Sequence, residues 1–206
     1  AWFDYSVPSG LKPAVPSGQE VGWGAHFGDI DHDGLEDAVV MHGWLATTIT
    51  PNVHDQPDGW FHGTSTGFDN VTNTWGLVDR GDNRGQVFAD LNGDGWLDLA
   101  RPSLNGPTVV YMANCGSGAW LEVALRQPGP NPRAIGATIL VESGDSVLTR
   151  YLLAGGEGYA SGRPAEAHFG LGSADEVTVE VRWPDGGVDR FPAQATGRRI
   201  TVIREE

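Results

Sequence analysis

The hydrophobic positions of this chain fall in short runs that suit β-strands better than helices. In residues 177–183, Val or Trp alternates with Thr, Glu and Arg, which is the pattern of a strand with one buried face. The turn sequence Pro-Asp-Gly-Gly at 184–187 leads into another apolar run at 188–191, which predicts a hairpin. Comparable short runs occupy residues 120–125, 135–141, 147–153 and 200–203. We therefore predict that residues 114–206 form a small β-sandwich or barrel.

The N-terminal part contains an internal repeat with an offset of 61 residues. Six positions of the first copy recur in the second, namely Gly24, Phe27, Asp29, Asp33, Gly34 and Asp37, which match Gly85, Phe88, Asp90, Asp94, Gly95 and Asp98. The residues that flank each copy, such as 25–27 and 38–41, look like buried strands. Two repeats of this length with short strands predict two blades of a β-propeller over residues 1–113.

Each copy has the spacing Asp-x-Asp/Asn-x-Asp-Gly-x-x-Asp, which suits a hard cation. Ca²⁺ takes roughly 6–8 oxygen ligands, and alternate residues of a tightly curled loop can point inward together. The glycine at the sixth position allows the positive φ that a sharp turn needs. The predicted ligands of the first ion are Asp29, Asp31, Asp33, the carbonyl of Leu35, and Asp37. Those of the second ion are Asp90, Asn92, Asp94, the carbonyl of Trp96, and Asp98.

Two other interpretations of these loops compete with the Ca²⁺ sites described above. An EF-hand needs a Glu at position 12 and a helix on each side, but position 12 is Val40 in one copy and Arg101 in the other. An Asp/Gly-rich hairpin turn without a metal is the simpler alternative for each loop. The repetition of both the ligand positions and the glycine favours two Ca²⁺ sites.

The two repeats and the C-terminal part each resemble a known family. Residues 27–37 and 88–98 resemble the FG-GAP/VCBS repeat of integrin-type β-propellers, in which such a loop joins two strands of a blade and binds Ca²⁺. Residues 131–137, 155–159, 168–172 and 181–186 resemble, in order, the ASPIC/UnbV domain. The resemblance to the ASPIC/UnbV domain implies a secreted or extracytoplasmic accessory domain, and it carries no catalytic residues over to this chain.

Charge and composition narrow the possible partners. The net charge is −14, and residues 1–113 hold 15 Asp and Glu against 4 Lys and Arg, which leaves −11 there and −3 in residues 114–206. Such a field repels phosphates, so nucleic acid and anionic membrane surfaces are poor partners. No apolar run is long enough for a membrane span, and the single cysteine, Cys115, excludes an internal disulfide.

Two further motifs carry weaker functional hypotheses. Arg80-Gly81-Asp82 is an integrin-type adhesion tripeptide that would have to be exposed to act. Two His and two carboxylates around Trp60 could hold Zn²⁺, although their spacing matches no known zinc motif; they are His54, Asp55, Asp58 and His62.

The sequence thus predicts a non-catalytic, Ca²⁺-binding propeller-type module that binds or assembles with protein or carbohydrate partners outside the cytoplasm, either secreted or periplasmic. The alternatives are a structural subunit of an extracellular filament or matrix, and a fragment of a propeller enzyme. Two blades leave strand edges open, which predicts self-association, the remaining blades of a longer chain, or docking of residues 114–206 onto an edge. We expect Ca²⁺ removal to destabilise residues 1–113 far more than residues 114–206.

Overall fold

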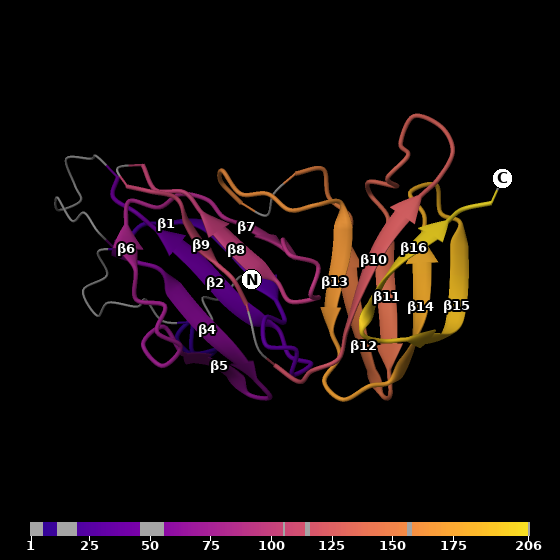
Figure 1. Ribbon diagram of the computed structural model, residues 1–206, viewed down its shortest axis with the longest axis horizontal. Coiled ribbons are helices and arrows are strands. Elements are labelled where there is room, and N and C mark those ends of the chain that lie inside the picture. Colours follow the sequence, from indigo (N-terminus) through magenta and orange to yellow (C-terminus); the bar gives the residue numbers. More distant parts are fainter. Residues whose placement is uncertain are drawn as a thin grey trace.

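The computed structural model describes residues 6–11, 20–45, 56–104, 106–113, 116–155 and 158–205. Within these ranges all regular secondary structure is β, which confirms the predicted all-β class. The strands form two groups that lie side by side along the longest axis of the molecule (Figure 1). None of the described sheets closes into a barrel. The described residues contain no helix with the length and apolar character of a membrane span.

The N-terminal group contains two antiparallel meanders that repeat the same plan. The first has the strand order β1-β2-β4-β5, formed by β1 (Gly22–Gly28), β2 (Asp37–His42), β4 (Gly59–Thr64) and β5 (Gly67–Asn70). The second has the order β7-β8-β9, formed by β7 (Val87–Ala89), β8 (Asp98–Arg101) and β9 (Val109–Tyr111). A small sheet pairs β3 (Gln56–Pro57) with β6 (Arg80–Gly81). The sequence repeat therefore produces a structural repeat, in which each Asp/Gly loop joins the first two strands of a meander.

The interior of this group mixes apolar and polar side chains. Its apolar cluster is built on five buried residues, namely Val39, Met41, Trp60, Phe88 and Leu99. Beside them Arg101 Nη1 lies 2.6 Å from Asp58 Oδ2, and the two side chains are only 2% and 3% exposed. Asp58 also accepts hydrogen bonds from the Asn83 side chain and from the backbone N–H of His42. This buried ion pair links the second meander to the first.

The C-terminal group is a sandwich of two sheets, as the alternating pattern predicted. One sheet has the order β13-β10-β16, formed by β10 (Trp120–Arg126), β13 (Glu166–Gly170) and β16 (Arg198–Ile203), with β10 and β16 parallel. The other has the order β12-β11-β14-β15, formed by β11 (Thr138–Ser143), β12 (Ser146–Tyr151), β14 (Glu176–Arg182) and β15 (Val188–Ala195). Their facing sides enclose an apolar core that includes Val177, Val179 and Val181.

One strand begins later than the sequence predicted. The apolar run at 135–141 becomes a strand only from Thr138, because residues 131–137 form a turn. The Asn131 side chain both donates to the carbonyl of Ile135 and accepts from its N–H, and Ala134 has a φ of 51°. The side-chain bonds satisfy the backbone locally, which competes with strand pairing.

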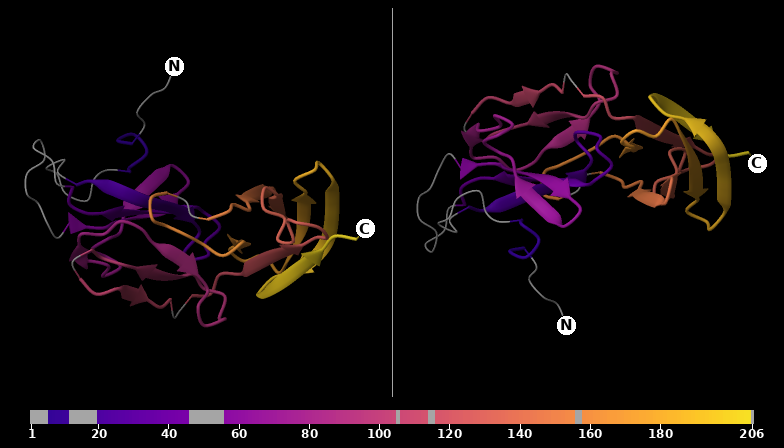
Figure 2. Two further views of the ribbon diagram at one scale, coloured as in Figure 1. Left: turned by 90° about the horizontal axis from the view of Figure 1, so that it is seen from above. Right: turned by 90° about the horizontal axis from the view of Figure 1, so that it is seen from below.

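The two groups meet through the segment between β12 and β13. Gly158 bridges to Gly24 of β1, and Gly162 bridges to Val87 of β7. Figure 2 shows this segment, drawn in orange, reaching in between the two meanders. The first strands of both meanders are thus partly paired by the C-terminal group, one of the ways in which the sequence predicted that open edges would be satisfied.

Candidate metal centre

The first Asp/Gly loop is curled around the side chain of Asp29. Its Oδ1 accepts the N–H of Asp33 at 3.0 Å, and its Oδ2 accepts the N–H of Gly34 at 2.8 Å. Gly34 has the positive φ expected at this position, 95°. Asp37, the first residue of β2, closes the loop by accepting the N–H of Ile30 at 2.8 Å. The backbone of the loop is therefore ordered by its own carboxylates.

The second loop repeats this hydrogen-bonding frame. Asp90 accepts the N–H of Asp94 at 3.1 Å through Oδ1 and that of Gly95 at 2.8 Å through Oδ2. Gly95 has a φ of 91°, and Asp98 accepts the N–H of Leu91 at 2.9 Å. The same residue types at the same spacing thus adopt the same local structure twice.

The last aspartate of each loop also binds the third strand of its meander. Asp37 Oδ1 accepts the N–H of Gly63, at the end of β4, at 2.8 Å. Asp98 Oδ1 accepts the N–H of Ala113, just after β9, at 2.9 Å. Each loop is therefore anchored at both ends, and the two loops sit at equivalent places in their meanders.

Carboxylates converge in the first loop. Oxygens of Asp29, Asp31 and Asp37 all lie within 4.8 Å of one another. Burial raises the pKa of Asp29 to about 7, and the nearby charges of Asp33, Asp37 and Asp31 raise it further. Burial likewise raises the pKa of Asp37 to about 6, with a smaller contribution from Asp31. A dication among these groups would stabilise their ionised forms, so the donor set fits Ca²⁺.

The second loop gathers its carboxylates less closely. Within the described residues, the close grouping of carboxylate oxygens occurs in the first loop and not among Asp90, Asp94 and Asp98. Asn92 instead donates its side-chain N–H to Asp94 at 2.8 Å. The hydrogen-bonding frame of the second loop matches that of the first, but the second loop offers one carboxylate fewer and a more open arrangement of its ligands.

Leu35 and Trp96 occupy the positions predicted to offer carbonyl ligands. The N–H of Leu35 donates to Asp33, and that of Trp96 donates to Asp94, which places both residues at the same point of their loops. The Leu35 side chain is 40% exposed. The Trp96 ring instead stacks on His32 with a centroid distance of 3.9 Å, a packing role that the sequence analysis did not predict.

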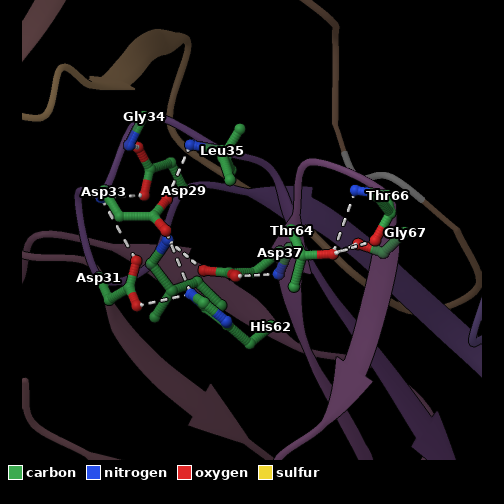
Figure 3. A network of polar contacts seen from close by, with 12 residues as sticks. Asp29, Asp31, Asp33, Gly34, Leu35, Asp37, His62, Thr64, Thr66 and Gly67 are labelled. Atoms are coloured by element: carbon green, nitrogen blue, oxygen red, sulfur yellow. Dashed lines mark hydrogen bonds and ion pairs between the residues drawn. The ribbon is translucent and has the colours of Figure 1, made fainter.

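His62 is a residue of the first site that the sequence analysis assigned elsewhere. It lies on β4, and its Nε2 is 3.1 Å from Asp31 Oδ2 and 3.2 Å from Asp33 Oδ2 (Figure 3). Burial lowers the pKa of His62, but the three nearby carboxylates outweigh it and raise the pKa overall. Of the other members of the hypothetical zinc cluster, Asp58 is bound by Arg101 and Asn83, while His54 and Asp55 lie outside the described residues.

The adhesion tripeptide is not presented as an exposed loop. Gly81 and Asp82 are buried, and Asp82 is only 4% exposed. Its Oδ1 accepts the N–H of Trp44 at 3.1 Å. Because an adhesion motif needs an accessible carboxylate, this geometry argues against the adhesion hypothesis.

Both loops contact the C-terminal group. The carbonyl of His32 accepts the N–H of Gly172 at 3.1 Å, and His168 Nε2 lies 2.9 Å from the carbonyl of Gly95. The imidazole of His32 is fully buried between Trp96 and His168. Burial lowers the pKa of both His32 and His168 to about 4, so the two rings are neutral at pH 7.

A cleft lies between the two groups. It is lined on the C-terminal side by Glu122, Glu166 and Arg150, and on the N-terminal side by His26 and Phe88, among others. Burial, together with a hydrogen bond to Glu166, raises the pKa of Glu122 to about 7. Arg199 bridges these two carboxyl groups from β16.

Comparison with known proteins finds a family match for the C-terminal part. Residues 127–206 match the family model described as ASPIC and UnbV, which confirms the predicted resemblance there. Cartilage acidic protein 1 of Mus musculus is 36% identical over 118 residues, which are 53% of this chain and 18% of that protein. The Homo sapiens protein of the same name is 36% identical over 118 residues, and that of Xenopus tropicalis is 33% identical over 108. The matched stretch spans less than a fifth of the length of each of these relatives.

Proposed function

We propose that this chain is an extracytoplasmic Ca²⁺-binding module, in which two FG-GAP/VCBS-type propeller blades hold one structural ion each and an ASPIC/UnbV domain packs against them. The observation that supports this most directly is the repeated hydrogen-bonding frame of the two loops. In both, the first aspartate orders the loop and the last one ties it to the third strand. A turn without a metal needs neither the additional carboxylates nor their repetition at the same positions.

The role of the ions in this proposal is structural. Asp29 and Asp37 are buried, and their carboxylates repel one another when both are ionised. A bound dication offsets that repulsion and binds the folded state alone, which adds about 2.7 kcal/mol of stability per site at a hundredfold excess over Kd. Sites of this kind would be filled outside the cytoplasm, where Ca²⁺ is plentiful. The name of the matched relatives refers to cartilage and to an acidic protein, and this chain shares the acidic character.

The module would act by binding or assembly with protein or carbohydrate partners. In the described structure β5 and β9 are the outer strands of their meanders, and a strand at the edge of a sheet can pair with another chain. Further blades of a longer protein, or a second copy of the module, would have the backbone groups that such edges require.

Calorimetric titration of the full chain with Ca²⁺ tests this function. We expect two binding steps, with Asp37→Ala removing one and Asp98→Ala removing the other. Asp185→Ala is the matched control, because Asp185 lies in an exposed turn of the C-terminal group and pairs with Arg204. No heat with the wild-type chain, or two steps that survive both substitutions, would contradict the proposal.

A second candidate function is acid–base chemistry at Glu122, since a carboxyl with a raised pKa in a cleft is what a general acid requires. We favour the binding module, because Arg199 bridges Glu122 and Glu166 in the manner of a structural charge network. Hydrolysis of a panel of chromogenic glycosides and esters by the wild type, lost in Glu122→Gln, would favour the enzyme instead.

A further inference from the structure

We propose that His62 gives the first loop a mixed nitrogen and oxygen ligand set, so that this loop accepts Zn²⁺ as well as Ca²⁺ while the second loop remains an oxygen site for Ca²⁺. This inference rests on the proposed function, since it treats both loops as cation sites. It assigns to the first loop an affinity for Zn²⁺ that the second loop lacks.

The register of the strands identifies the residue of the second loop that corresponds to His62. Ala38 of β2 lies opposite Phe61 of β4, and its equivalent Leu99 of β8 lies opposite Tyr111 of β9. His62 directly follows Phe61, and Met112 directly follows Tyr111. Each is then followed by the residue whose N–H binds the last aspartate of the loop. An imidazole in one site is therefore replaced by a thioether in the other.

The imidazole of His62 is placed to act as a ligand. Its Nε2 lies 3.1 Å from Asp31 Oδ2 and 3.2 Å from Asp33 Oδ2, and the three ligand atoms all lie within 4.8 Å of one another. Ligand atoms at the distances that Zn²⁺ prefers stand about 3.4 Å apart in a tetrahedral site, so little movement is needed. Figure 3 shows the ring reaching toward the two carboxylates from β4, across from the loop.

The ring is also held from outside the loop. Trp75 packs near it with a centroid distance of 5.9 Å, and the His62 side chain is 28% exposed. Met112, by contrast, is 47% exposed. A thioether is a soft and weak ligand, whereas imidazole suits Zn²⁺ and carboxylates suit both metals.

The competing explanation is that His62 is a counter-ion that neutralises Asp31 and Asp33 when no metal is bound. The two explanations predict opposite effects on Zn²⁺ affinity when the imidazole is removed. A counter-ion hinders every dication, so its removal would strengthen Zn²⁺ and Ca²⁺ binding alike. A ligand supports Zn²⁺ specifically, so its removal would weaken Zn²⁺ and leave Ca²⁺ nearly unchanged.

The test is calorimetric titration of the full chain with Zn²⁺ and, separately, with Ca²⁺ at pH 7.5. The variants are His62→Met, which copies the second loop, and Met112→His, which transplants the imidazole. We expect His62→Met to lower Zn²⁺ affinity at least tenfold and to change Ca²⁺ affinity less than threefold. Met112→His should add a Zn²⁺ site. Co²⁺ can replace Zn²⁺ and absorbs visible light. Its absorption bands in the wild-type chain should change in His62→Met, because a nitrogen ligand is lost.

An unchanged Zn²⁺ affinity in His62→Met, or an equal gain for both metals, would overturn the inference. Either result with Ca²⁺ still bound at both loops would leave the proposed function intact. Absence of Ca²⁺ binding by the wild-type chain would instead refute the proposed function. Thermal unfolding of each variant in Ca²⁺ shows whether the fold is retained.

Discussion

The two strand groups of this molecule are stabilised in different ways. The C-terminal group has sixteen buried apolar residues in its core, whereas the apolar cluster of the N-terminal group has five within the described residues. Of the buried polar or charged side chains in the described structure, thirteen lie in the N-terminal group and one, Glu122, lies in the C-terminal group. The first group therefore depends on compensation of buried charge, and the second on burial of apolar surface.

This difference explains why the two groups should respond differently to the same perturbation. A buried charge is tolerated only while its partner or ion is present. An apolar core does not depend on pH or on metals to that degree. The following predictions test this contrast, starting with the largest expected effect.

Removal of Arg101 should cause the largest loss of stability. Arg101→Met leaves the carboxylate of Asp58 buried without its ion-pair partner, which typically costs about 3–5 kcal/mol. Denaturant unfolding followed by tryptophan fluorescence reports on this group, because six of the eight Trp residues precede residue 100. Arg182→Met, at an exposed pair on β14, is the control and should unfold like the wild type. Similar losses in both variants would contradict the comparison.

A substitution in the C-terminal group should weaken cation binding in the N-terminal group. A Cβ at Gly170 would lie 1.9 Å from Asp29 Oδ2, so Gly170→Ala must displace this carboxylate at a cost of about 1–3 kcal/mol. We expect calorimetry to show weaker Ca²⁺ binding at the first loop and unchanged binding at the second. Gly162→Ala is the matched control, because its added Cβ meets open space. Equal Ca²⁺ affinity in both variants would show that the interface and the site are independent.

Acid should weaken Ca²⁺ binding at the first loop. With the pKa of Asp29 at about 7 and that of Asp37 at about 6, protons compete increasingly as the pH falls, and affinity should drop about twentyfold from pH 8 to pH 6. Calorimetry in two buffers of different ionisation enthalpy should also show proton release. A constant affinity over this range would contradict the raised pKa values of these two carboxyl groups.

Affinity is a better readout of these shifts than global stability. In the metal-free protein the raised pKa values of Asp29 and Asp37 make the folded state bind more protons than the unfolded state between about pH 4 and 7. Their contribution to stability therefore falls as the pH rises through this window. The lowered pKa values of His32 and His168 act in the opposite direction between about pH 4 and 6.5, so the two effects offset each other.

The smallest expected effect is a difference between the loops. The first offers four carboxylates and the second three, so the first should bind Ca²⁺ more tightly, by less than tenfold, provided that the rigidity of the sites is similar. Asp31→Asn makes the first loop match the second at this position and should reduce the difference. Asn92→Asp is the reciprocal variant. Identical affinities in the wild type would contradict this ranking.

The sequence predicted the local features well because they depend on residues close together in the chain. The Asp/Gly spacing specifies which carboxylate accepts which backbone N–H, and the alternation in 177–183 specifies which side chains β14 buries. Contacts between distant segments carried no such local signal. His62 lies 29 residues from Asp33, and Arg101 lies 43 residues from Asp58. His62 directly precedes Gly63, whose N–H donates to Asp37. This position could have pointed to His62 as part of the site, but only if the strand register had been known.

The contacts between the two loops and the C-terminal group change one expectation. The sequence analysis predicted that Ca²⁺ removal would leave residues 114–206 nearly unaffected. The N–H of Gly172 donates to the carbonyl of His32, and His168 contacts the carbonyl of Gly95. Residues 168–172, at the end of β13 and just after it, should therefore share the response of the loops. The core strands β11 and β14, which pair with each other away from the loops, should not.

Hydrogen exchange of the full chain in Ca²⁺ and in chelator tests this account most directly. We expect the chelator to remove protection from residues 25–40 and 86–101, to reduce it in residues 168–172, and to leave β11 and β14 as protected as before. Equal loss of protection in both groups would contradict the comparison between them. No loss in either loop would show that the loops are turns and that their carboxylates hold no ion.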